Sequence, residues 1–395
     1  MEISVFSSYP EKSLIHGNKT VGVGNYTKAT LTSLTKIMGD ANFKVIAEIL
    51  EQKDKYIENK IIIERTWKRG NVLSIILSIL KSSYSNADVI IFPFEMFMFG
   101  GFLHLALILP FMTFFKIKNK KVILVLHQII GDEFTVFEQN KIKRLFFRFI
   151  KPIFYKFLLF ISNKVIVFEE EFRHRLGKSD KVEVIPHAVL TENVLNKKEA
   201  KAKLGLDENK KYIFYFGFLA AYKGVDKLIN IWEELGGVNL IIGGGGNPNH
   251  LKDPQYQKYI QSIVDSAKGK GIITTGFIPQ DQMSCYFSSV DLVVFPYTVF
   301  MSSSGPLSHC FSYGRGVLLS SALRNYFNSV DMKKALDEAG ISIEEICFDL
   351  DKSIKNKILW ALHNQSKLEK FSQKMGQLRS WDKIAFDYQK VIQNL

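Results

Sequence analysis

Short apolar runs alternate with longer stretches of helical periodicity along the chain. Many of the runs are apolar at nearly every position, as in KVILVLH over residues 121–127. Strands of this kind are buried on both faces, and strands that alternate with helices form parallel sheets covered by helices on both sides. The pattern predicts strands at residues 3–8, 43–49, 60–66, 88–92, 121–127, 164–168, 182–186, 212–217, 238–244, 272–278, 292–297 and 316–321.

The strand pattern lapses over residues 187–211, where the sequence becomes polar and rich in lysine. A chain of 395 residues exceeds the size at which one hydrophobic core keeps growing. We therefore predict an α/β protein with two doubly wound, Rossmann-like domains that face each other across a cleft at this boundary. The predicted domains span residues 1–190 and 191–375, with a separate closing segment at 376–395.

Charge and cysteine content limit the binding partners and the cellular compartment that we expect for this protein. The formal net charge is +13, and residues 1–190 contribute +9 of it through 27 Lys and Arg against 18 Asp and Glu. This excess suits nucleic acid, anionic lipid or phosphorylated substrates, but no recognised nucleic-acid module accompanies it, so we expect no nucleic-acid partner. The three cysteines lack a CxxC pair and the N-terminus reads as a strand rather than a secretory signal, so we expect a cytoplasmic protein without a cysteine-based zinc site.

Two apolar segments are candidates for membrane contact. Residues 97–115 approach the length of a membrane span but contain glycines, His104 and Pro110, so we interpret them as a helix buried between the sheet and its neighbours. In residues 141–164, cations at spacings of three and four share one helix face while aromatic residues fill much of the rest, as at an interfacial helix. The alternative is a covering helix of the first sheet with a solvated lysine face. Pro152 is expected to kink or split this helix.

Several strands end at glycines, which let backbone amides approach a ligand, and a following helix N-terminus favours anions. The first loop contains Gly22-x-Gly24 but has Thr27 where a third glycine would complete a dinucleotide fingerprint, which disfavours a redox Rossmann domain. Residues 243–246 are four glycines, which either bind phosphate or form a flexible strand exit. The stretch YFGFLAAYKGVDKLI places Lys223 at a loop-to-helix junction, where its ammonium could neutralise a diphosphate or could simply be solvated.

The order of these motifs resembles retaining, nucleotide-sugar-dependent glycosyltransferases of family 4, which have the GT-B fold. The resemblance rests on GVGNYTKATLTSL, VILVLHQ and VEVIPHAV in the first half, and on YFGFLAAYKGVDKLI, LIIGGGG and the segment from TTGFIPQ to GVLLSS in the second. SWDKIAFDYQKVI resembles the family's closing helix, which packs back on the first domain. The resemblance spans nearly the whole chain.

The resemblance implies roles for individual residues. Lys223 would bind the donor diphosphate and, with His127 facing the sugar and acceptor, would support catalysis. The backbone of Phe277 and Ile278 would frame the nucleobase, and a helix start would cap phosphate or sugar through its amides. The implied donor-binding residues are Gly22, Gly24, Gly217, Lys223, Gly224, Phe277, Ile278, Ser304, Gly305, Pro306, Leu307 and His309.

The chain departs from the family pattern at the paired glutamates that many members carry eight positions apart. Met301 and His309 occupy these positions here, and Leu219, Ala220 and Ala221 replace a basic residue often found before the lysine. The histidines also have alternative readings. His127 could be a satisfied strand-end residue, His309 a residue of the helix core face rather than a ribose ligand, and His187 a residue that orders the linker.

We therefore expect a retaining glycosyltransferase that moves a sugar from a nucleotide diphosphate sugar to a lipid-linked or polysaccharide acceptor. Catalysis would stabilise the departing diphosphate and the developing positive charge on the sugar, without a tightly bound metal or other cofactor. The basic aromatic helix favours an anionic membrane surface as partner, at its cytoplasmic face. The rival hypothesis is a catalytically inactive homologue that binds a nucleotide sugar or a partner protein.

Overall fold

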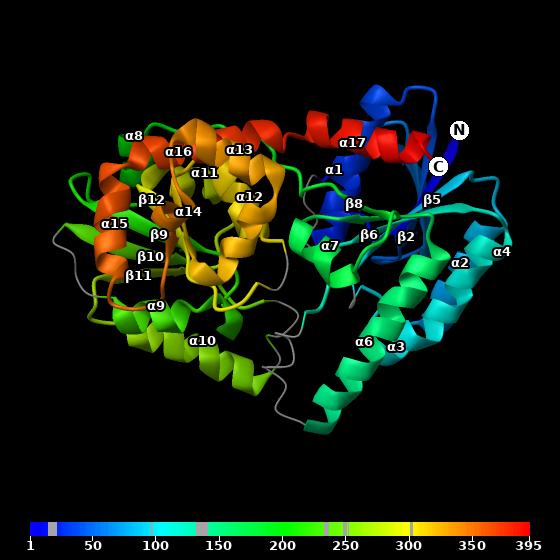
Figure 1. Ribbon diagram of the computed structural model, residues 1–395, viewed down its shortest axis with the longest axis horizontal. Helices are drawn as coiled ribbons and strands as arrows, with labels where there is room; N and C mark the ends of the chain where they lie inside the picture. Colours follow the sequence, from blue (N-terminus) through cyan, green and yellow to red (C-terminus); the bar gives the residue numbers. More distant parts are fainter. Residues whose placement is uncertain are drawn as a thin grey trace. The chain divides into compact units, whose positions relative to one another are not determined.

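The computed structural model describes residues 1–14, 22–95, 98–131, 141–232, 237–247, 251, 253–300 and 303–395. The chain divides into two compact units. Unit 1 comprises Met1–His187, Met301–Ser303 and Trp381–Leu395, and unit 2 comprises Ala188–Phe300 and Ser304–Ser380. Each unit is an α/β unit with a largely parallel sheet (Figure 1).

The described strands of unit 1 form one sheet in the order β3-β4-β2-β1-β5-β6-β7-β8. All its neighbouring pairs are parallel except β3 with β4. The strands are β1 (Glu2–Ser7), β2 (Asn42–Glu48), β3 (Asp54–Glu58), β4 (Ile61–Trp67), β5 (Val89–Phe94), β6 (Lys121–Leu126), β7 (Lys164–Val167) and β8 (Val182–Val184). The described helices of unit 1 are α1 (Gly22–Ile37), α2 (Val72–Ser83), α3 (Phe102–Ile108), a 3-10 helix (Leu109–Met112), α4 (Thr113–Ile117), α6 (Lys141–Ile161), α7 (Glu170–Leu176) and α17 (Trp381–Gln393).

The described strands of unit 2 form a parallel sheet in the order β11-β10-β9-β12-β13-β14. The strands are β9 (Lys211–Phe216), β10 (Val238–Gly243), β11 (Ile272–Gly276), β12 (Leu292–Phe295), β13 (Val317–Ser320) and β14 (Cys347–Phe348). The helices are α8 (Lys197–Lys203), a 3-10 turn (Ala221–Lys223), α9 (Val225–Ile231), α10 (Pro254–Ala267), α11 (Gln280–Ser289), α12 (Gly305–Ser312), a 3-10 helix (Ser321–Asn328), α13 (Val330–Ala339), α14 (Ile343–Ile346), α15 (Ile354–His363) and α16 (Gln365–Leu378). The predicted fold class is confirmed.

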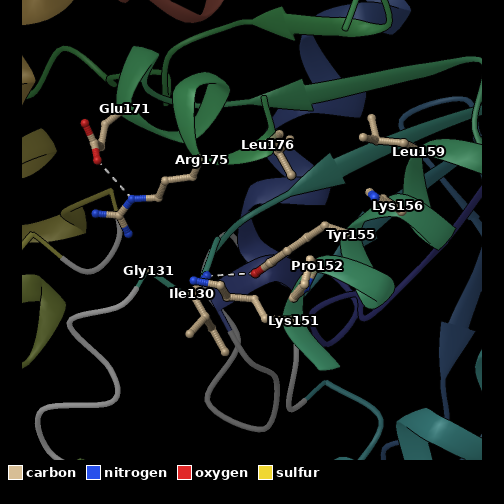
Figure 2. Close-up of a pocket in the computed structure, with 10 residues that line it drawn as sticks. All are labelled: Ile130, Gly131, Lys151, Pro152, Tyr155, Lys156, Leu159, Glu171, Arg175 and Leu176. Atoms are coloured by element: carbon tan, nitrogen blue, oxygen red, sulfur yellow. Dashed lines mark hydrogen bonds and ion pairs between the residues drawn. The ribbon is translucent and has the colours of Figure 1, made fainter. Parts of the chain in front are cut away.

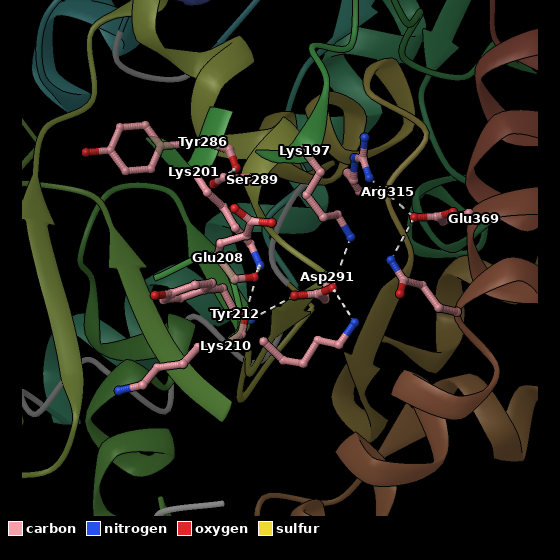
Figure 3. A network of polar contacts seen from close by, with 12 residues as sticks. Lys197, Lys201, Glu208, Lys210, Tyr212, Tyr286, Ser289, Asp291, Arg315 and Glu369 are labelled. Atoms are coloured by element: carbon pink, nitrogen blue, oxygen red, sulfur yellow. Dashed lines mark hydrogen bonds and ion pairs between the residues drawn. The ribbon is translucent and has the colours of Figure 1, made fainter. Parts of the chain in front are cut away.

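A buried carboxylate ties the start of unit 2 to its sheet. Asp291, which precedes β12, is fully buried and accepts hydrogen bonds from the Tyr212 amide at 2.9 Å and from Lys197 Nζ at 3.0 Å (Figure 3). Burial opposes its ionisation, but the Tyr212 amide and the Lys197 and Lys211 ammonium groups outweigh burial and lower the pKa of Asp291. The ionised side chain therefore joins α8, β9 and β12 into one framework.

Helix α17 completes unit 1 from a distant part of the sequence. It packs on α1, and the buried Tyr26 and Tyr388 hydroxyls share a hydrogen bond of 2.7 Å. A hydrogen bond between two hydroxyls shielded from water is expensive to break, because either oxygen would then be buried without a partner. The closing helix therefore returns to the first domain, as the resemblance implied.

One expectation for unit 1 requires correction. Residues 97–115 do not form one buried helix, because α3, a 3-10 helix containing Pro110 and α4 follow one another in the described part, and Leu103 is 71% exposed. Proline lacks the amide needed to continue the helical hydrogen bonds. Pro152 lies inside α6, which is one helix, so of the two outcomes expected there, a kink or a split, the split does not occur. In the described ranges, no helix has both the length and the apolarity needed to cross a bilayer.

Candidate active site

The strand order of unit 2 reverses between β9 and β12, since β10 and β11 lie on one side and β13 and β14 on the other. In open parallel sheets, ligands bind at the carboxyl ends of the strands where the order reverses. Gly217 follows β9, and the chain after β12 leads to Ser304 and α12. The Lys223 stretch and the start of α12, which the sequence analysis singled out separately, therefore leave neighbouring strands.

Gly217 allows Lys223 to approach the start of α12. The φ angle of Gly217 is +135°, and a Cβ atom built on it would lie 2.9 Å from Lys223 Nζ and 3.0 Å from Pro306 Cγ. Any larger residue at position 217 would displace the ammonium or the proline ring. The geometry thus explains the pairing of a glycine with a lysine in this stretch, and Gly224 follows Lys223 as the residue before α9.

The ammonium of Lys223 is buried beside two tyrosine rings. The residue is 6% exposed, and Nζ lies 6.0 Å from the ring centre of Tyr222 and 5.4 Å from that of Tyr297. Among the described residues, no carboxylate forms an ion pair with it. Burial alone lowers its pKa to about 8. Because a buried charge is unfavourable unless paired, this arrangement is suited to an anionic ligand.

The helix start at α12 offers fewer amides than the resemblance implied. Ser304 is the N-cap, and its Oγ accepts a hydrogen bond from the Leu307 amide at 3.3 Å. Pro306 has no N–H group, so neither it nor Leu307 presents a free amide to a ligand. The exposed Gly305 is the first residue of the helix, and no atom lies within 4 Å of the position where its Cβ would be. Gly305 is therefore the residue of this turn best placed to donate to a phosphate.

An exposed aromatic pair lies beyond the glycine run. Phe277 is 65% exposed, and its ring is nearly parallel to that of Phe218, with centres 6.5 Å apart, whereas Ile278 is buried. The glycine run packs closely on these loops, because a Cβ atom on Gly244 would lie 1.9 Å from the Gly217 oxygen. The four glycines are thus required for packing rather than for flexibility. Sequence reasoning missed Phe218, although an aromatic residue directly after the Gly217 turn was a usable signal.

His309 lies on α12 and packs edge-on against Phe216, with ring centres 5.9 Å apart. It is half-buried. Met301, the other position where family members carry a glutamate, lies outside the described residues.

His127 belongs to an aromatic cluster in unit 1. It follows β6, and its ring meets those of Tyr26 and Phe168 edge-on, each with centres 4.9 Å apart. The half-buried residue has a fully buried Nε2 atom without a hydrogen-bond partner in the described structure, so it is not the satisfied strand-end histidine of the alternative reading. Burial, with a smaller contribution from His187, lowers the pKa of His127 to about 3. The imidazole is therefore neutral at physiological pH.

The two N-terminal glycines lie in helix α1 rather than in a loop. Gly22 is its first residue, Gly24 is buried in its first turn, and most of the preceding loop lies outside the described residues. Thr27 explains the absence of a third glycine, because its Oγ1 lies 2.8 Å from Ser7 Oγ at the end of β1. A hydrogen bond between side chains replaces the close backbone approach of a dinucleotide-binding domain.

Glu95 was not singled out from the sequence. It follows β5, which pairs with β1 where the strand order of unit 1 reverses. Burial raises the pKa of this carboxyl group, with Arg69 opposing the effect. A carboxylate directly after a fully apolar strand was the available signal, and its position makes Glu95 a candidate for proton transfer. In the described parts of the chain, no cluster of three potential metal ligands occurs.

Unit 1 also contains a cavity of about 520 Å³ beside the end of β6 (Figure 2). Its walls come from α6 and α7, and the Ile130 amide donates a hydrogen bond of 2.7 Å to Tyr155 Oη. Arg175 Nε lies 3.0 Å from a carboxylate oxygen of Glu171. The lining combines apolar side chains such as Leu159 and Leu176 with the cations of Lys151, Lys156 and Arg175.

Comparisons with known proteins match this architecture. The family model for glycosyl transferases group 1 matches residues 196–308, which include Lys223 and the start of α12. Among solved structures, sucrose-phosphate synthase from Thermosynechococcus elongatus has a TM-score of 0.71 and 13% identity, over 100% of this chain and 98% of that chain. HepE from Anabaena in complex with UDP-glucose has a TM-score of 0.67 and 14% identity, over 100% of both chains.

A third similar structure is an alpha,alpha-trehalose-phosphate synthase (UDP-forming) from Burkholderia vietnamiensis, with a TM-score of 0.65 and 9% identity over 100% of this chain and 98% of that chain. No curated protein matches the sequence. At these identities the structures establish the fold, and the family match covers the segment that carries the buried lysine. The chain thus has the GT-B fold with a glycosyl transferases group 1 segment, and the prediction that it is a glycosyltransferase is confirmed.

Proposed function

We propose that this protein transfers a sugar from a nucleotide diphosphate sugar to a lipid-linked or glycan acceptor, with retention of configuration. The observation that carries the proposal is the buried ammonium of Lys223, which lacks an anionic partner among the described residues and lies where the strand order of unit 2 reverses. The donor diphosphate supplies the missing negative charge. The solved structures of HepE with UDP and with UDP-glucose support a donor of this class.

The bond between the sugar and the diphosphate breaks with its electron pair on the phosphate oxygen. Lys223 and the Gly305 amide stabilise the charge that develops on this leaving group, and burial strengthens their effect because little water screens it. The acceptor oxygen forms the new bond to the sugar carbon, and its proton passes to the released diphosphate. The neutral imidazole of His127 positions the sugar or acceptor through a hydrogen bond rather than by supplying a proton.

The nucleobase stacks on the Phe218–Phe277 pair. The two rings are nearly parallel, and Phe277 is more than half exposed, although an apolar side chain gains stability from burial. Nucleobases stack on exposed aromatic rings whatever hydrogen bonds the base can form. The proposal assigns the side chain of Phe277, as well as its backbone, to donor binding.

The acceptor reaches unit 1 from a membrane surface at the cytoplasmic face. Helix α6 combines the cations Lys141, Arg144 and Arg148 with exposed apolar residues, of which Phe149 is 66% and Ile153 is 64% exposed. Helix α4 contacts α6 and α2, and α2 contacts α3. These three helices carry further exposed apolar residues, namely Leu73, Leu77, Leu103, Leu107 and Ile117. Apolar groups enter the acyl boundary while cations meet anionic headgroups, which supports peripheral association.

The cavity in Figure 2 supports the same class of acceptor. It opens beside α6 and offers an apolar wall together with cations, which suits a phosphorylated headgroup attached to an apolar chain. We assign this cavity to the acceptor because it lies next to the end of β6, where His127 follows.

A single-turnover assay with labelled nucleotide sugar and excess protein tests the proposal. The wild type transfers label to a lipid extract, and Lys223→Met does not, whereas the matched change Lys227→Met at an exposed position of α9 has no effect. Release of nucleotide without transfer to lipid or glycan would refute the acceptor assignment. Donor binding without any turnover would favour the rival hypothesis of an inactive binding protein.

A further inference from the structure

A second cavity lies at the opposite end of the unit 1 sheet from His127. It measures about 460 Å³ and is lined by Lys116 of α4, Lys120 and Lys121 at the start of β6, and Lys181 before β8. Strand β6 has six residues, so at about 3.3 Å per residue its two ends are roughly 20 Å apart. This four-lysine cavity is therefore separate from His127, and it shares no lining residue with the cavity assigned to the acceptor.

Backbone carbonyls hold three of the ammonium groups in place. Lys116 donates to the Phe160 carbonyl at 3.1 Å, and Lys181 donates to the carbonyls of Leu159 and Ser162 at 2.8 Å each. Lys120 donates to the Ser85 carbonyl at 2.5 Å. These contacts orient the side chains, but carbonyl groups do not neutralise their charges.

No described carboxylate pairs with any of the four lysines within 4 Å. The end of α6 explains part of the cluster, since cations are favourable near a helix C-terminus. A helix end, however, carries only about half an elementary negative charge, against four positive charges here. The lysines also lie close enough to affect one another, because burial and then the charge of Lys116 lower the pKa of Lys181. The cavity therefore holds a surplus of positive charge that capping does not account for.

The lining adds neutral donors and an apolar rim. Asn163 accepts a hydrogen bond from the Val122 amide through Oδ1, which leaves the two N–H groups of its side chain for another partner. Phe160 belongs to the lining and is 57% exposed. Convergent ammonium and amide donors match the several oxygens of a phosphate group.

We propose that the four-lysine cavity is a second anion site of this protein, which binds a phosphate ester carrying two or more negative charges. The exposed Phe160 in its lining indicates a phosphorylated lipid headgroup as the source, with a soluble phosphate as the alternative that the experiment distinguishes. The site is independent of the proposed sugar transfer and requires neither the donor nor the acceptor.

The test uses the full-length chain in the Lys223→Met background, so that the donor site does not contribute to phosphate binding. Lys116→Gln/Lys121→Gln removes two exposed cations of the cavity, and Lys53→Gln/Lys55→Gln removes two exposed cations elsewhere in unit 1. Equal melting temperatures of the variants verify folding. The probes are inorganic pyrophosphate, followed by calorimetry, and phosphatidylcholine vesicles with and without phosphatidic acid, followed by sedimentation.

We expect the cavity variant to bind the favoured probe about 25-fold more weakly, at about fivefold for each lysine, and the control variant to bind it like its parent. Loss of vesicle binding that depends on phosphatidic acid identifies a lipid source, and loss of pyrophosphate binding alone identifies a soluble phosphate. The proposal is overturned if the parent binds neither probe, or if the cavity and control variants lose the same affinity. A Lys223-dependent shift with nucleotide sugars, measured separately, reports on the donor site alone.

Discussion

Replacing Lys223 with methionine tests whether its ammonium is present for a ligand or for the fold. Methionine keeps a similar length and an apolar stem, so it removes the charge with little change in packing. If the ammonium serves a ligand, the change should stabilise the protein without ligand and weaken the protein with it. If the ammonium instead stabilises the fold, the substitution should destabilise the protein both without ligand and with ligand.

The magnitude follows from the pKa of the lysine. It falls from its usual 10.5 to about 8 through burial. A tenfold change in proton affinity is worth about 1.4 kcal/mol, so holding the ammonium charged in the ligand-free folded protein at neutral pH costs about 3 kcal/mol. Without ligand, the free energy of unfolding of the methionine variant should therefore exceed that of the wild type by up to about 3 kcal/mol. The same variant cannot form the buried charge pair between Lys223 and the diphosphate. Loss of this pair should weaken donor binding by about 3 kcal/mol, or roughly 100-fold.

The pH dependence follows with a definite sign. Between pH 8 and 10.5 the unfolded chain binds a proton at Lys223 that the folded chain has released, so the stability of the ligand-free wild type rises across this window. Donor binding requires the charged form, so donor affinity falls about tenfold per pH unit above 8. Below pH 8 neither quantity depends on this group.

Thermal unfolding and calorimetry with a nucleotide diphosphate sugar measure both effects on wild type, Lys223→Met and Lys227→Met. We expect the first variant to melt above the wild type without ligand and to show no shift with ligand. A Lys223→Met variant that melts below the wild type, or that binds the donor unchanged, refutes the argument from the unpaired buried charge. Lys227→Met should match the wild type in both measurements.

Three further predictions concern other parts of the chain. His127→Phe keeps the packing against Tyr26 but removes Nε2. Single-turnover sugar transfer should therefore fall at least about tenfold while the melting temperature stays unchanged. Undiminished transfer would exclude a role for the imidazole. Phe277→Ala should weaken nucleotide binding about fivefold, or about 1 kcal/mol, without changing pyrophosphate binding by calorimetry, and equal losses for both would contradict base stacking. Tyr388→Phe should destabilise unit 1 by about 1 kcal/mol, read as faster amide hydrogen exchange in α1, and unchanged exchange would show that the hydroxyl pair contributes nothing.

Most strands were predictable because a strand buried on both faces in a parallel sheet is a continuous apolar run. Strand β3 was not, because three of the five residues in its sequence DKYIE are charged and it lies at the antiparallel edge of the sheet. Its pairing depends on a turn in which Asn59 and Lys60 both have positive φ angles, a geometry that glycine would have signalled but these residues do not. Strand β14 has only two residues and no pattern of its own.

The site was predictable at the level of motifs but not at the level of contacts. The stretch around Lys223 identified a lysine next to a strand end, because glycine and a helix start recur at phosphate sites. The absence of a carboxylate partner among the described residues, and the stacking of Phe277 on Phe218, depend on side chains brought together from separate loops. No local pattern encodes such long-range juxtapositions, and the four-lysine cavity escaped notice for the same reason.

The return of α17 to α1 makes unit 1 discontinuous in sequence, and this affects the order of folding during synthesis. Residues 381–395 leave the ribosome only after all of unit 2 has been made. Until then, the buried side chains of α1 that contact α17, Tyr26 among them, lack this part of their packing. All of unit 2 precedes residue 381 in the sequence. A ribosome that stalls there releases a chain that has every residue of unit 2 but lacks the helix that completes unit 1, so part of the apolar surface of unit 1 stays exposed. Chaperones and proteases recognise exposed apolar surfaces, so we expect them to bind or degrade chains that end before α17.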